Sequence, residues 1–202
     1  MFNTENLREA YLQSENNSDI KSALLAEDSF RDAAIIAKTQ LSSQAYSPAL
    51  EAWLKARLNI GPAVNETSGD GVWDKQNVEI KVSLGGKSGQ FNFVQIRPDH
   101  DIDGYLFVTY SIWNDEVTWF YVSPNDMNDL ILEFGGYAHG TIKALGRITE
   151  DNIKGRNCEY ALRPDPHKKS GKARACWDAL VRVGKKPQSF FISEKPELRI
   201  VA

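Results

Sequence analysis

Two acidic residues and one lysine, Asp70, Glu79 and Lys81, have the types and the spacing that divalent-metal chemistry needs. Glu79 and Lys81 alternate with apolar residues, which predicts a half-buried strand that carries both charged side chains on its polar face. A polar step at 75–76 separates this strand from 71–73, which predicts a tight hairpin between the two segments. The side chains that this hairpin would direct into the core are Trp73, Val78, Ile80 and Val82.

The register of this hairpin decides which charged groups meet. If residues 74 and 77 flank the turn, Asp70 lies opposite Lys81 and Val72 lies opposite Glu79. Directly opposed residues share one face of a sheet, so the two carboxylates and the lysine converge. Mg2+ is typically held by one or two carboxylates together with substrate phosphate, which makes Asp70 and Glu79 the expected ligands. Asp74 is the alternative to Asp70, because a different register would bring it closer.

A metal ion at this position would polarise a phosphoryl group and lower the pKa of a bound water. Lys81 can orient that water or neutralise the charge that develops on the phosphate in the transition state. The competing interpretation is a surface hairpin whose charged side chains are simply solvated, because Glu-x-Lys is common on strands. The acidic residue upstream and the apolar opposite face favour the catalytic interpretation.

Asp70, followed after a short hairpin by Glu79-Ile80-Lys81, resembles the signature of the PD-(D/E)XK nucleases, which include many type II restriction endonucleases. Gly69 stands where the family often has proline. The segments 89–98 and 105–110 are similar to the segments after the metal-binding strand in some restriction-type members. The signature covers about fourteen residues, and a helix before it with a strand and a helix after it also fits the family core.

The resemblance implies an α/β fold with a restriction-endonuclease-like core, in which a central mixed β-sheet is flanked by α-helices. It implies Mg2+ as cofactor, Asp70 and Glu79 as metal ligands and Lys81 as the catalytic lysine. Glu51, in the preceding helix, is a further candidate ligand, although we favour a capping or solvated role for it. The implied activity is sequence-specific cleavage of double-stranded DNA by a homodimer. The alternatives are a structure-specific repair or recombination nuclease of the same fold and a DNA-binding protein without catalysis.

The net charge of −3 conceals a strong asymmetry along the chain. Between positions 139 and 186 there are twelve basic and five acidic residues, a net charge of +7, so the remainder carries −10. Segregated positive charge is typical of a surface that binds phosphate backbones, although a single basic cluster is often only a solvated face. The DNA contacts that we expect are Lys87, Arg97, His139, Arg163, Lys168, Lys169, Lys172 and Arg174.

The 202 residues suit one domain, in which we distinguish three regions. Region 1–46 is helical, with helices expected over 4–12 and 18–41, and its apolar stripe predicts a core or dimer contact. Region 47–136 is the expected catalytic core, and 137–202 is a basic, DNA-contacting region packed on the same domain. Within the core, we expect a helix over 48–58 with Ser47 as its N-cap, a helix over 90–97, a strand pair over 105–113 and 117–122, and a helix over 123–134.

The sequence lacks the patterns typical of membrane insertion, of secretion and of a zinc site. No apolar run approaches the length of a membrane-spanning helix, and the N-terminus has no signal-peptide pattern. The two cysteines, Cys158 and Cys176, lie eighteen positions apart without a zinc-site pattern. We therefore expect reduced thiols and a cytoplasmic protein that does not contact membranes.

Overall fold

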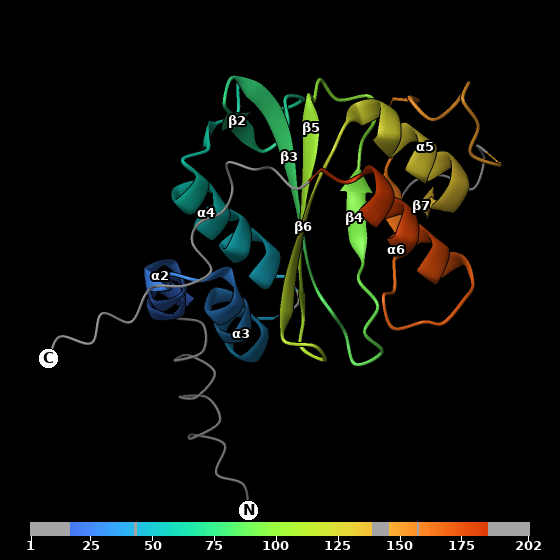
Figure 1. Ribbon diagram of the computed structural model, residues 1–202. Helices are drawn as coiled ribbons and strands as arrows, with labels where there is room; N and C mark the ends of the chain where they lie inside the picture. The colour runs from blue at the N-terminus through green and yellow to red at the C-terminus, as the bar shows by residue number, and fades with distance from the viewer. Residues whose placement is uncertain (1–16, 43, 139–145, 157, 186–202) are drawn as a thin grey trace, which may run out of the picture.

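The computed structural model describes residues 17–42, 44–138, 146–156 and 158–185 (Figure 1). This part of the chain contains five helices and eight strands. The helices are α2 (Asn17–Ala26), α3 (Phe30–Gln40), α4 (Tyr46–Leu58), α5 (Pro124–Phe134) and α6 (Lys172–Val183). The strands are β1 (Gly61–Pro62), β2 (Gly71–Trp73), β3 (Gln76–Leu84), β4 (Phe93–Ile96), β5 (Gly104–Ser111), β6 (Glu116–Val122), β7 (Gly136–Tyr137) and β8 (Tyr160–Leu162).

A five-stranded mixed sheet with the order β1-β2-β3-β5-β6 forms the centre of the protein. β3 and β5 are parallel, and the other neighbouring strands are antiparallel. The chain is thus a mixed α/β protein, as expected. A parallel pair needs a crossover connection, and here it runs through β4, which belongs to a second, three-stranded sheet with the order β4-β8-β7.

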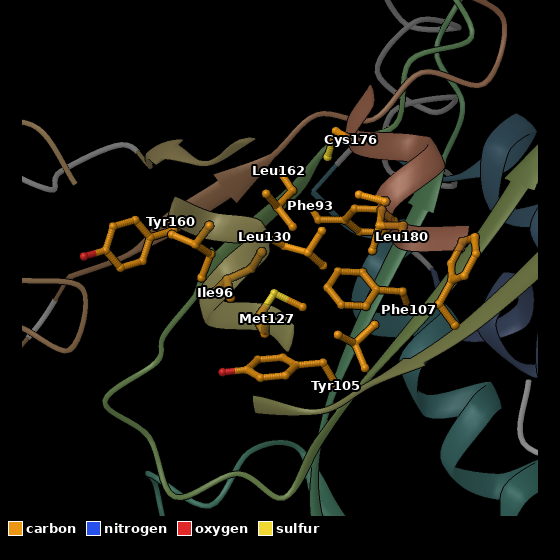
Figure 2. Close-up of a cluster of buried hydrophobic side chains, with 14 of the residues drawn as sticks. Phe93, Ile96, Tyr105, Phe107, Met127, Leu130, Tyr160, Leu162, Cys176 and Leu180 are labelled. Atoms are coloured by element: carbon orange, nitrogen blue, oxygen red, sulfur yellow. The ribbon is translucent and has the colours of Figure 1, made fainter. Parts of the chain in front are cut away.

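Each face of the central sheet has its own hydrophobic core. On one face, apolar side chains of β3 and β5 pack against α2, α3 and α4. On the other face, β5 and β6 pack against the second sheet, α5 and α6. Figure 2 shows this second core, where the rings of Phe93 and Phe107 meet edge to face between helices α5 and α6. All eight residues of β5 are buried, which explains its nearly continuous apolar sequence.

Most of the apolar stripe of the N-terminal region faces the interior of the protein itself, although Leu25 is 43% exposed. Leu24, Phe30 and Ala34 all belong to the first core. The expected single helix over 18–41 is wrong, because two helices separated at 27–29 occupy this segment. Trp53 and Arg57 of α4 donate hydrogen bonds to the Glu27 carbonyl at the break. The Ser29 hydroxyl then accepts from the Asp32 amide and caps the second helix.

Two further predictions about local structure need correction. Segment 90–97, for which we favoured a helix, contains strand β4. The helix expected over 48–58 begins at Tyr46, and Ser47 is not its N-cap but lies within its first turn. The hairpin of β5 and β6 and the helix after Ser123 are confirmed, and the Ser123 hydroxyl caps α5 by accepting from Asp126. The helix expected over 4–12 lies outside the described residues.

The basic region packs onto the central domain through its apolar residues. Cys158, Tyr160, Cys176 and Leu180 all belong to the second core, and both cysteines are free thiols. Burial raises the pKa of the Cys176 thiol to about 12. Across the described ranges, none of the helices has the length and apolar character needed to cross a membrane.

Candidate active site

The hairpin that carries the three charged residues turns at Asp74 and Lys75, both of which have positive φ. Two consecutive residues of this kind form the type I′ turn that matches the twist of paired strands. Gly71 therefore pairs with Val78, and the register that we expected, with Asp70 opposite Lys81 and Val72 opposite Glu79, is wrong by two residues. A shift of two keeps every side chain on its face, whereas a shift of one would reverse the faces.

Asp70 is fixed at the start of this hairpin by its backbone and by its carboxylate. Gly69 has φ of +73°, and a Cβ there would lie 2.6 Å from the Val78 carbonyl oxygen. Proline, which fixes φ near −65°, could not occupy this position, which accounts for the departure from the family signature. One carboxylate oxygen of Asp70 accepts a hydrogen bond of 2.7 Å from the Ile80 amide. Asp74, the alternative ligand, lies exposed in the turn at the other end of β2.

Helix α4 lies along the edge of β3 that β2 leaves uncovered. β2 pairs with β3 only from Gln76 to Val78, and the polar groups beyond that point find side-chain partners instead. The Ser47 hydroxyl of α4 donates to the Val82 carbonyl at 3.3 Å. Burial raises the pKa of the Tyr46 hydroxyl, opposed by a hydrogen bond with the Leu84 backbone. The early start of α4 thus brings its first turns against β3.

Glu79 and Lys81 form an ion pair of 2.5 Å that is largely enclosed by the protein, with side chains 9% and 13% exposed. They lie on the same face of the sheet as Tyr105 and Phe107, their partners on β5. A pair of charges withdrawn from water is costly unless each group keeps a partner. The enclosure therefore favours a specific role for this pair over the solvated hairpin that Glu-x-Lys usually indicates.

Glu51 projects from α4 toward the same charges. The pKa of its carboxyl is raised to about 7, mainly by burial and in part by the neighbouring charges of Asp70 and Glu79, whereas Lys81 and Lys55 oppose the shift. The carboxyl of Glu51 thus interacts electrostatically with Asp70, Glu79 and Lys81. Its burial does not fit the capping or solvated role that we favoured for it. The charges of Glu51 on α4, of Asp70 before β2 and of Glu79 and Lys81 on β3 are thus near enough to influence one another.

The donor set at this edge suits a hard divalent cation. Glu51, Asp70 and Glu79 supply only oxygen atoms, and one or two carboxylates suffice for Mg2+ when water and substrate phosphate complete its shell. Among residues 17–42, 44–138, 146–156 and 158–185, no group of three or more His, Cys, Asp or Glu side chains is arranged so that it could hold a metal ion. A site that relies on few protein ligands remains compatible with that finding.

The raised pKa of Glu51 predicts a pH-dependent cost to stability in the metal-free protein. Because the folded state holds this proton up to about pH 7, whereas an unperturbed carboxyl loses it near 4.5, stability falls as the pH rises through that interval. We expect Glu51→Gln to be more stable than the wild type at about pH 8, by as much as about 3 kcal/mol. Near pH 4 the two proteins should be equally stable.

Urea denaturation in EDTA at both pH values checks this prediction. Mg2+ should then raise the melting temperature of the wild type more than that of Glu51→Gln at alkaline pH, since a cation relieves the crowding of carboxylates. Equal stability of the two proteins across the pH range would show that Glu51 is well solvated.

A residue that sequence reasoning missed, Gln95, lies in the crossover strand over this face. The Asn92 amide donates to the Ser83 hydroxyl at 2.9 Å, and Ser83 shares its face with Glu79 and Lys81. Nine residues later the chain is tied to the other end of β3, where the Asn77 side chain donates to the Asp101 carbonyl. The intervening segment therefore crosses β3 on the face of the ion pair.

Gln95 has φ of +55° within a bulge of β4 and is exposed. The other non-glycine residues with positive φ lie in turns or at a helix end, where that conformation is common. Bulges redirect side chains next to active sites, and strain of this kind persists where the surroundings enforce it. Only a correct strand assignment for 93–96 would have drawn attention to Gln95.

The structure separates the expected DNA contacts into two groups. Arg97 pairs with Glu159, and Arg174 pairs with Asp178 and donates to the Pro166 carbonyl, so both guanidinium groups already bind the protein. The exposed members of the set are Lys87, Arg163, Lys168, Lys169 and Lys172. His139 lies outside the described residues.

Comparisons with known proteins identify no relative: no protein-family model matches the sequence, and no curated protein matches it.

Proposed function

We propose that the protein is a Mg2+-dependent endonuclease of the restriction type that hydrolyses phosphodiester bonds in double-stranded DNA. The observation that carries this proposal is the enclosed Glu79–Lys81 pair on β3, with the Asp70 carboxylate bound to the Ile80 amide of the same strand and the charge of Glu51 nearby. The mixed sheet, with α4 before the hairpin and the parallel strand β5 after it, is compatible with the core that the resemblance to PD-(D/E)XK nucleases implies.

Each residue of the site has a role that its contacts support. Mg2+, when bound, supplies a Lewis acid for the phosphoryl group and acidifies a bound water. Asp70 and Glu79 would hold the ion, Glu51 would add a nearby negative charge, and the Ile80 amide fixes the orientation of the Asp70 carboxylate. Lys81, held beside Glu79, donates to the phosphate or orients the attacking water.

A duplex presents two strands to be cut, and a palindromic site is matched by a protein with two-fold symmetry. We therefore propose a homodimer as the cutting form. The exposed lysines and Arg163 would contact the phosphate backbone.

Incubation of purified protein with plasmid and phage DNA at low salt, with Mg2+ or with EDTA, tests the function. The proposal predicts discrete fragments with Mg2+ and intact DNA with EDTA. Smears, or cutting confined to flaps and junctions, would instead indicate a structure-specific nuclease. Binding without cutting on unmodified and methylated DNA would contradict the proposal and leave a DNA-binding protein.

Replacement of Gln95 by glycine is expected to raise the stability of the fold and to lower the rate of cleavage. Glycine adopts positive φ without strain, so we expect Gln95→Gly to stabilise the fold by about 1 kcal/mol. The same change removes an exposed carboxamide from the strand that crosses β3 on the face of the ion pair. If this carboxamide positions the DNA, its loss should slow cleavage about tenfold or more, since a displaced substrate costs rate steeply. Urea denaturation and the rate of plasmid linearisation measure the two effects.

Asn59→Gly is the matched control, because Asn59 has φ of +54° at the C-terminal end of α4. It should leave cleavage unchanged. Full cleavage activity in Gln95→Gly would remove Gln95 from the site.

A further inference from the structure

The hairpin tip between β5 and β6 exposes two large apolar side chains that the proposed site does not use. Ile112 is 55% exposed and Trp113 is 62% exposed. The remaining tryptophans, which are buried or half-buried, are Trp53, Trp73, Trp119 and Trp177. An exposed tryptophan beside an exposed isoleucine costs solubility, and such patches commonly mark binding surfaces.

Two neighbouring loops hold this tip in place. The Trp113 indole nitrogen donates to the Gly86 carbonyl at 3.4 Å, which ties the tip to the loop after β3. The Ser111 hydroxyl lies 3.2 Å from Nε2 of His167, which ties it to the loop before α6. A Cβ at Gly89 would lie 2.3 Å from the His167 ring, so these two loops also contact one another. We call loops 85–89, 112–115 and 163–171 together the three-loop tip.

The charges of the three-loop tip suit a polyanion. Lys87, Lys168 and Lys169 are exposed on it, and none of them has a carboxylate partner among the contacts of the described chain. Of its acidic groups, Asp115 pairs with Arg31, and Asp165 is fully buried. Glu116 follows the tip on β6 and is the exposed acidic neighbour.

The distance along β5 between the site and the three-loop tip is short enough for one bound duplex to contact both. β3 and β5 run parallel with Lys81 beside Phe107, and β5 ends at Ser111, after which the turn carries Ile112 and Trp113. At about 3.3 Å per residue, the end of β5 lies about 13 Å along the strand from Phe107. That length corresponds to about four base pairs of B-DNA.

We propose that the three-loop tip is a second contact region for double-stranded DNA, in which Trp113 and Ile112 insert between bases or stack on them while the lysines bind the flanking phosphates. Apolar wedges of this kind unstack base steps, and aromatic stacking is favourable with any base. A partner protein is disfavoured because lysine is depleted in the cores of protein interfaces. This inference rests on the proposed function, since it names a further part of the same substrate surface.

Binding of a labelled duplex of about 25 base pairs by the full chain tests the inference, with Lys81→Ala present throughout to prevent cutting. We expect Trp113→Ala to weaken binding about tenfold or more. Trp113→Phe should retain most of the affinity, because an aromatic ring remains. Val181→Ala is the matched control, because Val181 is 53% exposed on α6 and lies outside the three-loop tip. Duplex DNA should also quench tryptophan emission, and Trp113→Phe should remove most of that quenching.

The outcomes separate this inference from the proposed function. Unchanged affinity in Trp113→Ala, with the background protein binding DNA and the wild type cutting it, would overturn the role of the three-loop tip alone. If the wild type neither binds nor cuts DNA, the proposed function fails and the inference fails with it. A change from dimer to monomer in Trp113→Ala without DNA would make the tip a protein interface and would likewise overturn the inference.

Discussion

Removal of the Lys81 ammonium group is expected to reduce DNA cleavage about 100- to 1000-fold while duplex binding stays within about threefold. Lys81 lies beside Glu79 in an enclosed pair, where a positive charge stabilises a developing phosphate charge more strongly than it would in water. Because alanine would leave Glu79 buried without its partner, Lys81→Met is measured alongside Lys81→Ala. Methionine keeps the length and the packing of the side chain but removes the charge.

Plasmid cleavage rates and duplex affinities of the two variants measure this effect, and thermal unfolding shows whether each variant is folded. Lys38→Ala, at an exposed position of α3, is the control and should cut at the wild-type rate. A folded Lys81→Met protein that cuts as fast as the wild type would exclude Lys81 from the chemistry.

The second large effect is expected at the carboxylates. Asp70→Asn keeps an oxygen that can accept from the Ile80 amide but loses the negative charge that the proposed site would use to bind Mg2+. Loss of a residue that only hydrogen-bonds to a metal ligand typically lowers activity about 10- to 100-fold. Because Asp70 is proposed to bind the metal directly, we expect its substitution to lower the cleavage rate by more than that. The Mg2+ concentration required for half-maximal cleavage should also rise, and Glu79→Gln should behave similarly.

Asp74→Asn is the matched control, since it makes the same chemical change in the exposed turn of the same hairpin. Its cleavage rate should stay within about twofold of the wild type, because solvent separates this carboxylate from the site. Loss of cleavage in Asp74→Asn with full activity in Asp70→Asn would reverse the assignment of the first ligand.

The local pattern of the hairpin of β2 and β3 could be predicted, but its register could not. Alternation around Glu79 and Lys81 identifies the strand and its faces, because the period of two is fixed by the backbone. The register depends on the turn type, and Asp74-Lys75 adopts positive φ without the glycine that usually indicates a type I′ turn. The error of two residues was harmless only because it preserved the faces.

Contacts between distant segments account for what the sequence did not reveal. β4 forms because β8 pairs with it from more than sixty positions away, which no local pattern between 90 and 97 indicates. The position of Glu51 in the helix before the hairpin was enough to make it a candidate metal ligand. Its raised pKa, however, depends on where α4 lies against the uncovered edge of β3. The positive φ of Gln95 could not be predicted either, because it arises from a bulge in the pairing of β4 with the distant strand β8.

The most direct test of the proposed site compares the wild type with the Asp70→Asn/Glu79→Gln double variant, both purified in the same way, by the initial rate of conversion of supercoiled plasmid in Mg2+. We predict discrete, Mg2+-dependent cutting by the wild type and no cutting above background by the double variant. Equal cutting by both preparations would contradict the proposed function of this site, because the activity would then arise outside the carboxylates that α4 and β3 bring together.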